Sequence, residues 1–127
     1  MADAPKTPSG SIAWVDLTVP DAEGVRDFYQ AVAGWEFQGC DMGGYEDFSM
    51  MPAGTDQPVA GICHARGGNA EMPPQWMIYI TVPDLDAAVA TCKEKGGEVL
   101  VGPKGESMRF CVIRDPAGAV SALFEAK

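Results

Sequence analysis

The sequence predicts an α+β fold built from two tandem β-α-β-β-β units. The main observation is a repeat, because Thr18-Val19-Pro20-Asp21 recurs as Thr81-Val82-Pro83-Asp84, 63 residues later in a chain of 127 residues. Each copy follows a run rich in β-branched and aromatic residues and precedes apolar residues at helical spacing. These flanking patterns favour a strand and then a helix. A motif that recurs with its flanks at half the chain length indicates an internal duplication.

A strand opens each predicted unit, over Ser11–Val19 in the first and Gln75–Val82 in the second. The proline of each motif lacks a backbone N–H group and ends the strand. The aspartate after it can accept a hydrogen bond from the first turn of a helix, so it is the expected N-cap. Each motif is therefore the junction between a strand and a helix.

A helix follows in each unit, with apolar residues at positions i, i+3, i+4 and i+7. In the first unit these residues are Val25, Phe28, Tyr29 and Val32, and in the second they are Leu85, Ala88, Val89 and Cys92. Both patterns run into glycine, at Gly34 and at Gly96-Gly97, where helices commonly end.

Three shorter strands complete each unit, over residues 35–40, 45–51 and 58–64 in the first and 98–101, 108–114 and 119–125 in the second. Turn sequences separate them, including Gly102-Pro103 and Asp115-Pro116-Ala117-Gly118. We therefore expect a single domain over residues 1–127, with the first unit at 11–64, a linker at 65–74 and the second unit at 75–125.

Composition predicts a soluble, cytoplasmic protein that binds neither nucleic acid nor membranes. No apolar run approaches the roughly 18 residues that a spanning helix needs. The chain carries 9 Lys and Arg against 18 Asp and Glu, a net charge of −9, and its basic residues form no stripe that could follow a phosphate backbone. The four cysteines contain no C-x-x-C pair, so we expect reduced thiols.

The ordered set of motifs resembles the glyoxalase, bleomycin-resistance and extradiol dioxygenase superfamily, also called the vicinal oxygen chelate superfamily. The resemblance rests on the two strand-Val-Pro-Asp-helix openings, on Asp115-Pro116-Ala117-Gly118 before the last strand, and on Asp27-Phe28-Tyr29, Gly34-Trp35 and Gly96-Gly97, and it runs from about Ser11 to Lys127. It implies curled mixed sheets that enclose a cavity, helices on the outside and, in many members, pairing of two chains.

Strand parity then separates the two faces of each opening strand, because alternate residues face opposite sides of a sheet. The apolar set is expected to face the helix and comprises Ala13, Val15, Leu17 and Val19 in the first unit and Ile78, Ile80 and Val82 in the second. The other set is expected to face the cavity and comprises Trp14, Asp16, Thr18, Met77, Tyr79 and Thr81.

Metal-binding members of the superfamily place His and Glu ligands on the first and last strand of each unit. The corresponding positions are Trp14, Gly61, Met77 and Ala122, none of which is a usual ligand for a hard or borderline cation. The chain contains a single histidine, His64, whereas a two-His-one-carboxylate iron site needs two. We therefore expect no bound metal and no cofactor.

Several residues are candidates for contact with a ligand. Trp14 could stack on an aromatic ligand or fill space, and Tyr79 could donate a hydrogen bond or reach solvent. Phe48, Met50 and Met77 are expected to line an adaptable apolar wall. Three other residues carry groups that could take part in chemistry. Asp16 is an inward acid that could act as a base or pair with Arg109, and His64 and Cys63 give no clear nucleophile or base.

Three functions are compatible with this sequence. The first is a metal-independent small-molecule binder of the bleomycin-resistance type that works as a homodimer. Its ligand pocket is expected to be lined by Trp14, Asp16, Phe48, Met50, Met77, Tyr79 and Arg109. The second is a glyoxalase-like lyase or isomerase that uses Asp16 or Tyr79 for proton transfer on a small oxygenated substrate. The third is an interaction module with a closed cavity. One scaffold can host all of these roles, so the residues of the site must decide between them.

Overall fold

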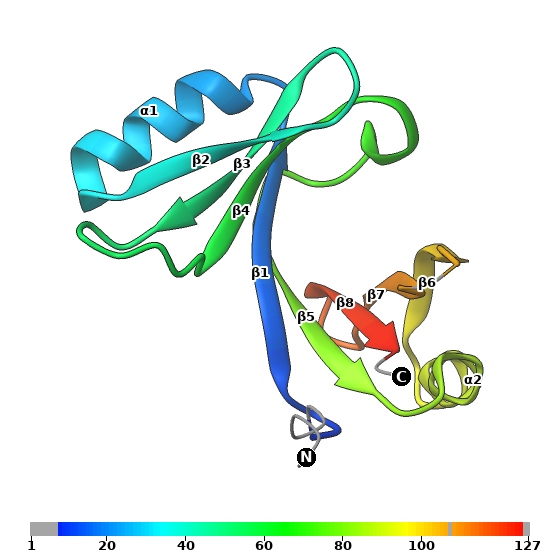
Figure 1. Cartoon of the computed structure of the whole chain (residues 1–127). Helices are drawn as coiled ribbons and strands as arrows, with labels where there is room; N and C mark the ends of the chain where they lie inside the picture. The colour runs from blue at the N-terminus through cyan, green and yellow to red at the C-terminus, as the bar shows by residue number, and fades with distance from the viewer. Residues whose placement is uncertain (1–7, 107, 126–127) are drawn as a thin grey trace. The chain divides into compact units, whose positions relative to one another are not determined.

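A computed structural model describes residues 8–106 and 108–125, which form eight strands, two α-helices and a short 3₁₀ helix (Figure 1). Along the chain these are β1 (Ile12–Val19), α1 (Ala22–Ala33), β2 (Glu36–Asp41), β3 (Glu46–Met51), β4 (Ala60–His64), η1 (Gly67–Asn69), β5 (Trp76–Val82), α2 (Leu85–Glu94), β6 (Glu98–Lys104), β7 (Phe110–Arg114) and β8 (Val120–Glu125). Among the residues so described, no helix is long and apolar enough to cross a membrane.

The chain divides into two compact units whose bounds differ from the predicted ones. From here on, the first unit means residues 15–76 and the second unit means residues 8–14 and 77–125. In the first unit the strand order is β2-β3-β4-β1, with β1 parallel to β4 and the other pairs antiparallel. The second unit has the order β5-β8-β7-β6, with β5 parallel to β8. We call the four strands of the first unit the first sheet and those of the second unit the second sheet. Each unit thus combines one parallel and two antiparallel pairs, which confirms the α+β class and the β-α-β-β-β plan.

The chain before β1 is tied to the second unit by backbone hydrogen bonds. Gly10 N donates to Thr81 O at 2.8 Å, and Thr81 N donates to Ser11 O at 2.9 Å. The Thr81 hydroxyl adds a bond to Pro8 O at 2.8 Å. Thr81 therefore anchors residues 8–11, although sequence parity had placed it on the face proposed for a ligand.

The repeated motif starts both helices as the sequence predicts. The Asp21 carboxylate accepts a hydrogen bond from Gly24 N, and the Asp84 carboxylate accepts one from Ala87 N, each at 3.0 Å. These contacts satisfy N–H groups that have no partner inside a helix, a role in which Asp is favoured. Helix α1 ends at Gly34, whose φ of 73° is a left-handed conformation that glycine adopts at little cost.

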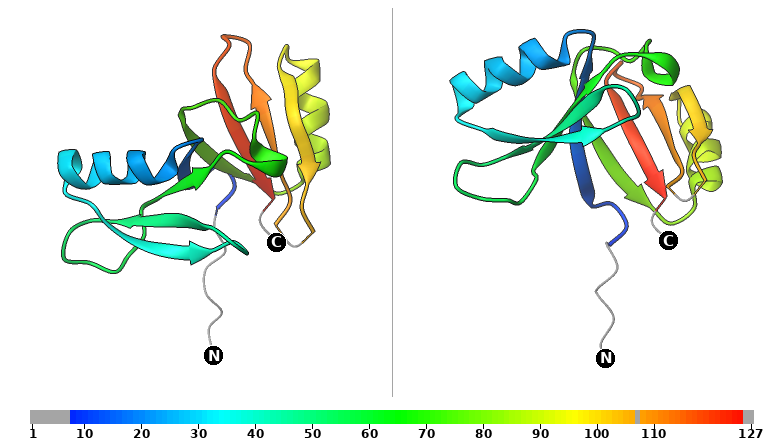
Figure 2. Two further views of the ribbon diagram at one scale, coloured as in Figure 1. Left: turned by 90° about the horizontal axis from the view of Figure 1, so that it is seen from above. Right: turned by 45° about the horizontal axis from the view of Figure 1, so that its top comes forward.

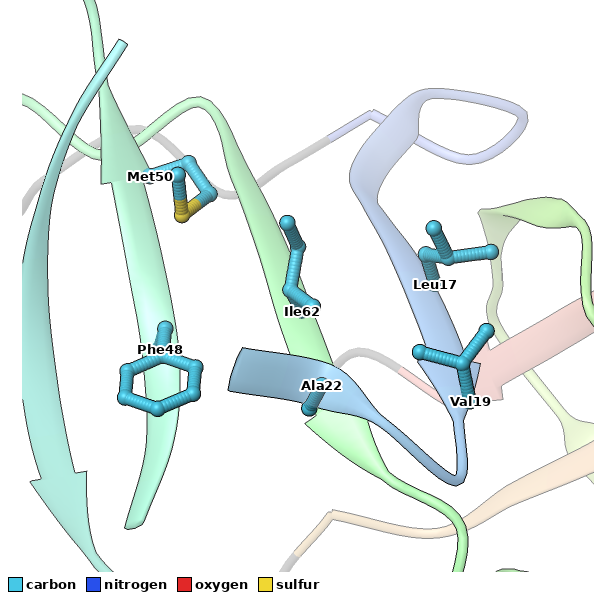
Figure 3. Packing of buried hydrophobic residues seen from close by; sticks show 6 residues of the cluster. All are labelled: Leu17, Val19, Ala22, Phe48, Met50 and Ile62. Atoms are coloured by element: carbon cyan, nitrogen blue, oxygen red, sulfur yellow. The ribbon is translucent and has the colours of Figure 1, made fainter. Parts of the chain in front are cut away.

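A core of buried side chains joins α1 to its sheet (Figure 3). The members are Leu17, Val19, Ala22, Phe48, Met50 and Ile62, and Val25, Tyr29, Trp35 and Trp76 pack against them. The Trp76 Nε1–H group also donates to the Tyr29 hydroxyl at 3.1 Å, so this partly buried tryptophan has a hydrogen-bond partner. The predicted apolar face of α1 is only half correct, because Phe28 and Val32 are 55% and 65% exposed.

Helix α2 packs on one face of the second sheet (Figure 2). Its buried centre is Leu85, Cys111 and Leu123, with Ile80, Val82, Ala88, Val89, Val99 and Ile113 around it. The predicted helix-facing parity of the strand at 75–82 is therefore confirmed for Ile80 and Val82.

The predicted turn at Gly102-Pro103 is wrong, because both residues lie inside β6. The β6–β7 register shifts there, between Val101 and Lys104, and such an irregularity accommodates Gly and Pro.

Candidate functional site

The first sheet has one face against α1 and one face turned away from it. Register identifies the two faces, because directly opposed residues on neighbouring strands point to the same side. Leu17, Ile62 and Phe48 are opposed across β1, β4 and β3, and all three belong to the core under α1. The alternate set, Asp16, Gly61 and Ser49, is likewise opposed and lies on the face away from the helix. The predicted orientation of Asp16 and Gly61 agrees with this register.

The expected position of Phe48 and Met50 in the ligand wall is wrong. Their side chains are 2% and 0% exposed and pack with Leu17, Val19 and Ala22 under α1 (Figure 3). The physical reason is strand parity: the polar residues Asp47 and Ser49 alternate with them, so the apolar set is the one that a helix covers. Phe48 and Met50 are residues of the core and leave the candidate site.

The second sheet repeats this arrangement with different chemistry. Tyr79, Ala122 and Val112 are opposed across β5, β8 and β7, on the face away from α2. Met77 has the same parity as Tyr79 and is 3% exposed. The Tyr79 ring lies 6.4 Å from the Phe110 ring, centroid to centroid. Asp16 opposite Gly61 in one unit thus corresponds to Tyr79 opposite Ala122 in the other.

Arg109 is held by carboxylates of the second unit. Its guanidinium lies 3.1 Å from the Asp86 carboxylate and 3.8 Å from the buried Glu125 carboxylate. The hydrogen bond from Arg109 to Asp86 raises the pKa of the arginine. Glu125 is itself engaged, because its Oε2 atom accepts a hydrogen bond from Leu85 N at 2.8 Å, at the start of α2. Arg109 therefore has a structural role beside α2, and its pairing with Asp16 stays a prediction.

A polar cluster lies where β3 and β4 meet, and its centre is Asp47. The Asp47 Oδ1 atom accepts a hydrogen bond from His64 N at 2.8 Å and lies 3.3 Å from His64 Nδ1. The side chains of Asp47 and His64 are 13% and 17% exposed. Sequence analysis had given His64 no partner, and the signal for one was weak, because the two residues are 17 positions apart and only the strand register brings them together.

Cys63 shares the face of Asp16 and belongs to the same cluster. Burial raises the pKa of its thiol from 9.0 to about 12, with further contributions from the charges of Asp16 and Asp47 and from a side-chain hydrogen bond to Asp47. A raised thiol pKa keeps the group protonated at neutral pH, and the thiolate is the reactive form. Cys63 is therefore a poor nucleophile and a donor to Asp47.

Aromatic rings and guanidinium groups surround this cluster. The His64 ring has Tyr45 at 5.5 Å, edge to face, and Phe48 at 6.1 Å. Arg66 lies over the Tyr45 ring at 3.8 Å. Arg26 on α1 lies over the Phe48 ring at 4.6 Å and over the Phe37 ring at 4.3 Å. Such stacking is favourable, so these side chains have fixed neighbours.

The four superfamily metal positions carry no ligand here. Trp14, Gly61, Met77 and Ala122 offer an indole, a bare backbone, a thioether and a methyl group, none of which suits a hard or borderline cation. Within residues 8–106 and 108–125, no three His, Cys, Asp or Glu side chains are grouped so that they could hold a metal ion. The side chains at these four positions do not fit the superfamily's metal.

The family model described as the Glyoxalase/Bleomycin resistance protein/Dioxygenase superfamily matches residues 11–122. Among curated proteins, "Putative glyoxylase CFP32" of Mycobacterium tuberculosis is 33% identical over 120 residues, covering 92% of this chain and 46% of the relative. The "Anthracycline biosynthesis protein DnrV" of Streptomyces peucetius is 31% identical over 128 residues, covering 91% of this chain and 46% of the relative. The chain thus spans about half the length of these relatives.

Solved structures share the fold at low identity. A glyoxalase/bleomycin resistance protein/dioxygenase superfamily member from Vibrio splendidus 12B01 aligns with a TM-score of 0.59 at 12% identity, covering 88% of this chain and 96% of the other. Hypothetical protein BH1468 from Bacillus halodurans C-125 aligns with a TM-score of 0.61 at 14% identity, covering 94% and 96%. At such identities the similarity concerns the fold alone.

Proposed function

Because the chain belongs to the Glyoxalase/Bleomycin resistance protein/Dioxygenase superfamily, we propose that it is a small-molecule-binding protein that works without a bound metal. One observation carries the proposal. On the face away from each helix, a polar residue stands opposite a small one, Asp16 opposite Gly61 and Tyr79 opposite Ala122. The small residues stand at positions that the superfamily resemblance assigns to metal ligands and bring no donor side chain there, which suits an organic ligand better than a cation.

The ligand class follows from the groups on these faces. The Asp16 carboxylate accepts hydrogen bonds, and the Tyr79 hydroxyl both donates and accepts. The rings of Tyr79 and Phe110, 6.4 Å apart, add an aromatic surface, and half-buried Trp14 has the same parity as Asp16. The name of the relative DnrV refers to anthracycline biosynthesis. On either unit taken by itself, such groups favour an oxygenated aromatic small molecule.

We propose a homodimer as the working assembly. Pairing of two chains is what the superfamily resemblance implies for many members. Closed two-fold dimers are also the commonest form of homo-oligomer.

The experiment that tests this function is native mass spectrometry of protein purified without chelator, combined with elemental analysis. We expect a dimer that carries a small organic molecule and less than a tenth of an equivalent of any transition metal. The released molecule is then identified and its affinity measured by calorimetry. One equivalent of zinc, nickel, iron or manganese per chain would contradict the proposal. Binding of the released molecule only when metal is present would also contradict it.

Two conservative variants locate the ligand. Tyr79→Phe removes only the hydroxyl group, and Asp16→Asn keeps the shape of the side chain while removing its charge. Losing a hydrogen bond to a ligand costs about 0.5–1.5 kcal/mol for a neutral pair, so we expect an affinity loss of roughly 2- to 13-fold for Tyr79→Phe. Asp56→Asn is the matched control, because Asp56 is exposed in the loop between β3 and β4. Equal affinities for all three variants and the wild type would exclude both faces.

A second candidate is a glyoxalase-like lyase or isomerase in which Asp16 moves a proton. The charge of Asp16 contributes to the raised pKa of Cys63, so a carboxylate and a protonated thiol stand close together on a partly buried face. A carboxylate in such surroundings can act as a general base. The name of CFP32 also points to a glyoxylase. Solvent-hydrogen exchange at a carbon next to a carbonyl, lost in Asp16→Asn, would favour this candidate over simple binding.

A further inference from the structure

Asp47 is fixed from several sides. It accepts hydrogen bonds from the backbone N–H group of His64 at 2.8 Å and from the Cys63 thiol, and its Oδ1 atom lies 3.3 Å from His64 Nδ1. These donors come from the neighbouring strand β4, so the carboxylate cannot rotate without breaking more than one contact. Asp47 is therefore a rigid acceptor in front of the imidazole ring.

This contact determines which ring nitrogen carries the proton. An ionised carboxylate only accepts hydrogen bonds, so His64 Nδ1 must be the donor. In the neutral ring the other nitrogen, Nε2, is then an acceptor. No hydrogen bond to Nε2 occurs among the described residues, and the side chain is 17% exposed. The structure thus presents one oriented imidazole nitrogen with an open lone pair.

The surroundings of His64 favour an aromatic partner. Tyr45 meets the imidazole ring edge to face at 5.5 Å, and the Arg66 guanidinium lies over the same Tyr45 ring at 3.8 Å. A half-buried ring and a planar cation offer a flat surface on which another ring can stack. The positive charge of Arg66 also favours a ligand that carries negative charge.

We propose that His64, positioned by Asp47, accepts a proton from an acidic aromatic hydroxyl group of the ligand. The O–H bond of the ligand breaks, the proton binds to Nε2, and the electron pair stays on the ligand oxygen, which becomes a phenolate. Asp47 balances the charge of the resulting imidazolium, as an orienting carboxylate does for a histidine base. The inference rests on the proposed small-molecule binding, and it places the recognised group beside His64, which stands opposite Val19 on the helix side of the first sheet and not on the face of Asp16.

The first test needs no ligand. Because His64 is the only histidine in the chain, selective ¹⁵N labelling of histidine gives a single imidazole spectrum. We expect the neutral ring to carry its proton on Nδ1 and to show a bare Nε2. Asp47→Asn is expected to reduce the population of this tautomer, whereas Glu46→Gln, which removes one negative charge from the adjacent residue, leaves it unchanged. A wild-type spectrum with the proton on Nε2 would overturn the proposal.

The second test uses 4-nitrophenol as the probe, because its phenolate form has a visible absorption band. At a pH where the free probe is mostly protonated, the wild-type protein is expected to increase the phenolate band at least twofold and to shift the His64 Nε2 signal. His64→Gln keeps a side chain that can donate to Asp47, and backbone amide spectra check its fold. We expect this variant to lose the band increase.

Two outcomes separate this inference from the proposed function. If the probe shifts backbone amides but changes neither the phenolate band nor the His64 signals, proton acceptance by His64 is refuted and small-molecule binding stands. If the probe shifts no signal at all, the aromatic hydroxyl class is refuted, while a different co-purified organic molecule in the mass spectrum would still support the proposed function.

Discussion

Replacing Met50 with alanine separates two roles that a buried methionine could have. In the structure the Met50 side chain is 0% exposed and packs under α1 with Phe48 and Ile62. As a core residue it should stabilise the fold and leave ligand affinity unchanged. As part of a ligand wall it should change affinity more than stability. We expect the first result.

The size of the effect follows from the burial. Met50→Ala removes three non-hydrogen atoms from a packed site, and such substitutions destabilise by about 2–5 kcal/mol. Phe37 stands opposite Met50 on β2 and is 37% exposed, so its ring can move toward the space and limit the cavity. We therefore expect the lower part of the range, about 2–3 kcal/mol, which corresponds to a fall in melting temperature of roughly 8–12 °C for a chain of this size.

Urea unfolding followed by tryptophan fluorescence is the appropriate assay, because Trp35 and Trp76 pack against the same core. With a slope of about 2 kcal/mol per molar urea, the midpoint should fall by roughly 1–1.5 M. Met42→Ala is the matched control, since Met42 is 49% exposed and should change stability by less than about 0.5 kcal/mol. A loss below about 1 kcal/mol for Met50→Ala, together with weaker ligand binding, would refute the core assignment.

Three further predictions concern the thiols and a buried carboxylate. Burial raises the pKa of Cys63 from 9.0 to about 12, so the folded thiol stays protonated at pH values where the unfolded thiol ionises. The wild type should therefore lose stability relative to Cys63→Ala as pH rises from 9 to 12. Urea midpoints of the two proteins that change in parallel with pH would contradict this. Exposed Cys40 should react with iodoacetamide before Cys63, as peptide mass spectrometry would show. Glu125→Ala leaves Leu85 N without its acceptor and should lower the free energy of unfolding, measured with urea, by about 1–3 kcal/mol. Glu71→Ala, at an exposed position, should lower it by less than about 0.5 kcal/mol.

The elements of the fold were predictable because the duplicated motif places strand ends and helix starts directly. Asp21 and Asp84 cap their helices as expected, since this choice depends on local chemistry. The faces of β1 were predictable for a similar reason. Its residues Leu17 and Val19 alternate with Asp16 and Thr18, and a helix covers the apolar set. The extent of β6 was not predictable, because Gly102-Pro103 usually marks a turn and only the pairing with β7 keeps it in the strand.

The site was less predictable, because its contacts depend on register between strands. Phe48 and Met50 were assigned to a ligand wall on the assumption that a cavity face is apolar. The alternation of these residues with Asp47 and Ser49 already indicates that the polar set faces away from the helix. The contact between Asp47 and His64 had no such signal, since it requires β3 and β4 to pair with Phe48 opposite Ile62. The metal-free chemistry of the proposed site stays a prediction.

Comparison of the two units explains why His64 is available for a ligand. His64 stands opposite Val19 in the first unit, and Glu125 stands opposite Val82 in the second, at the corresponding position of the repeat. Glu125 is used by the fold, because it accepts the first N–H group of α2 and pairs with Arg109. His64 instead contacts Asp47 through Nδ1, and its Nε2 atom has no hydrogen-bond partner among residues 8–106 and 108–125.

The same position is therefore structural in one unit and free to bind in the other, and the two substitutions should separate these roles. Glu125→Ala should reduce stability by about 1–3 kcal/mol. His64→Gln should reduce it by less than about 1 kcal/mol and abolish deprotonation of the aromatic hydroxyl probe. Similar stability losses for both variants would mean that His64 also serves the fold, and the repeat would then give no reason to place the proton acceptor at this position.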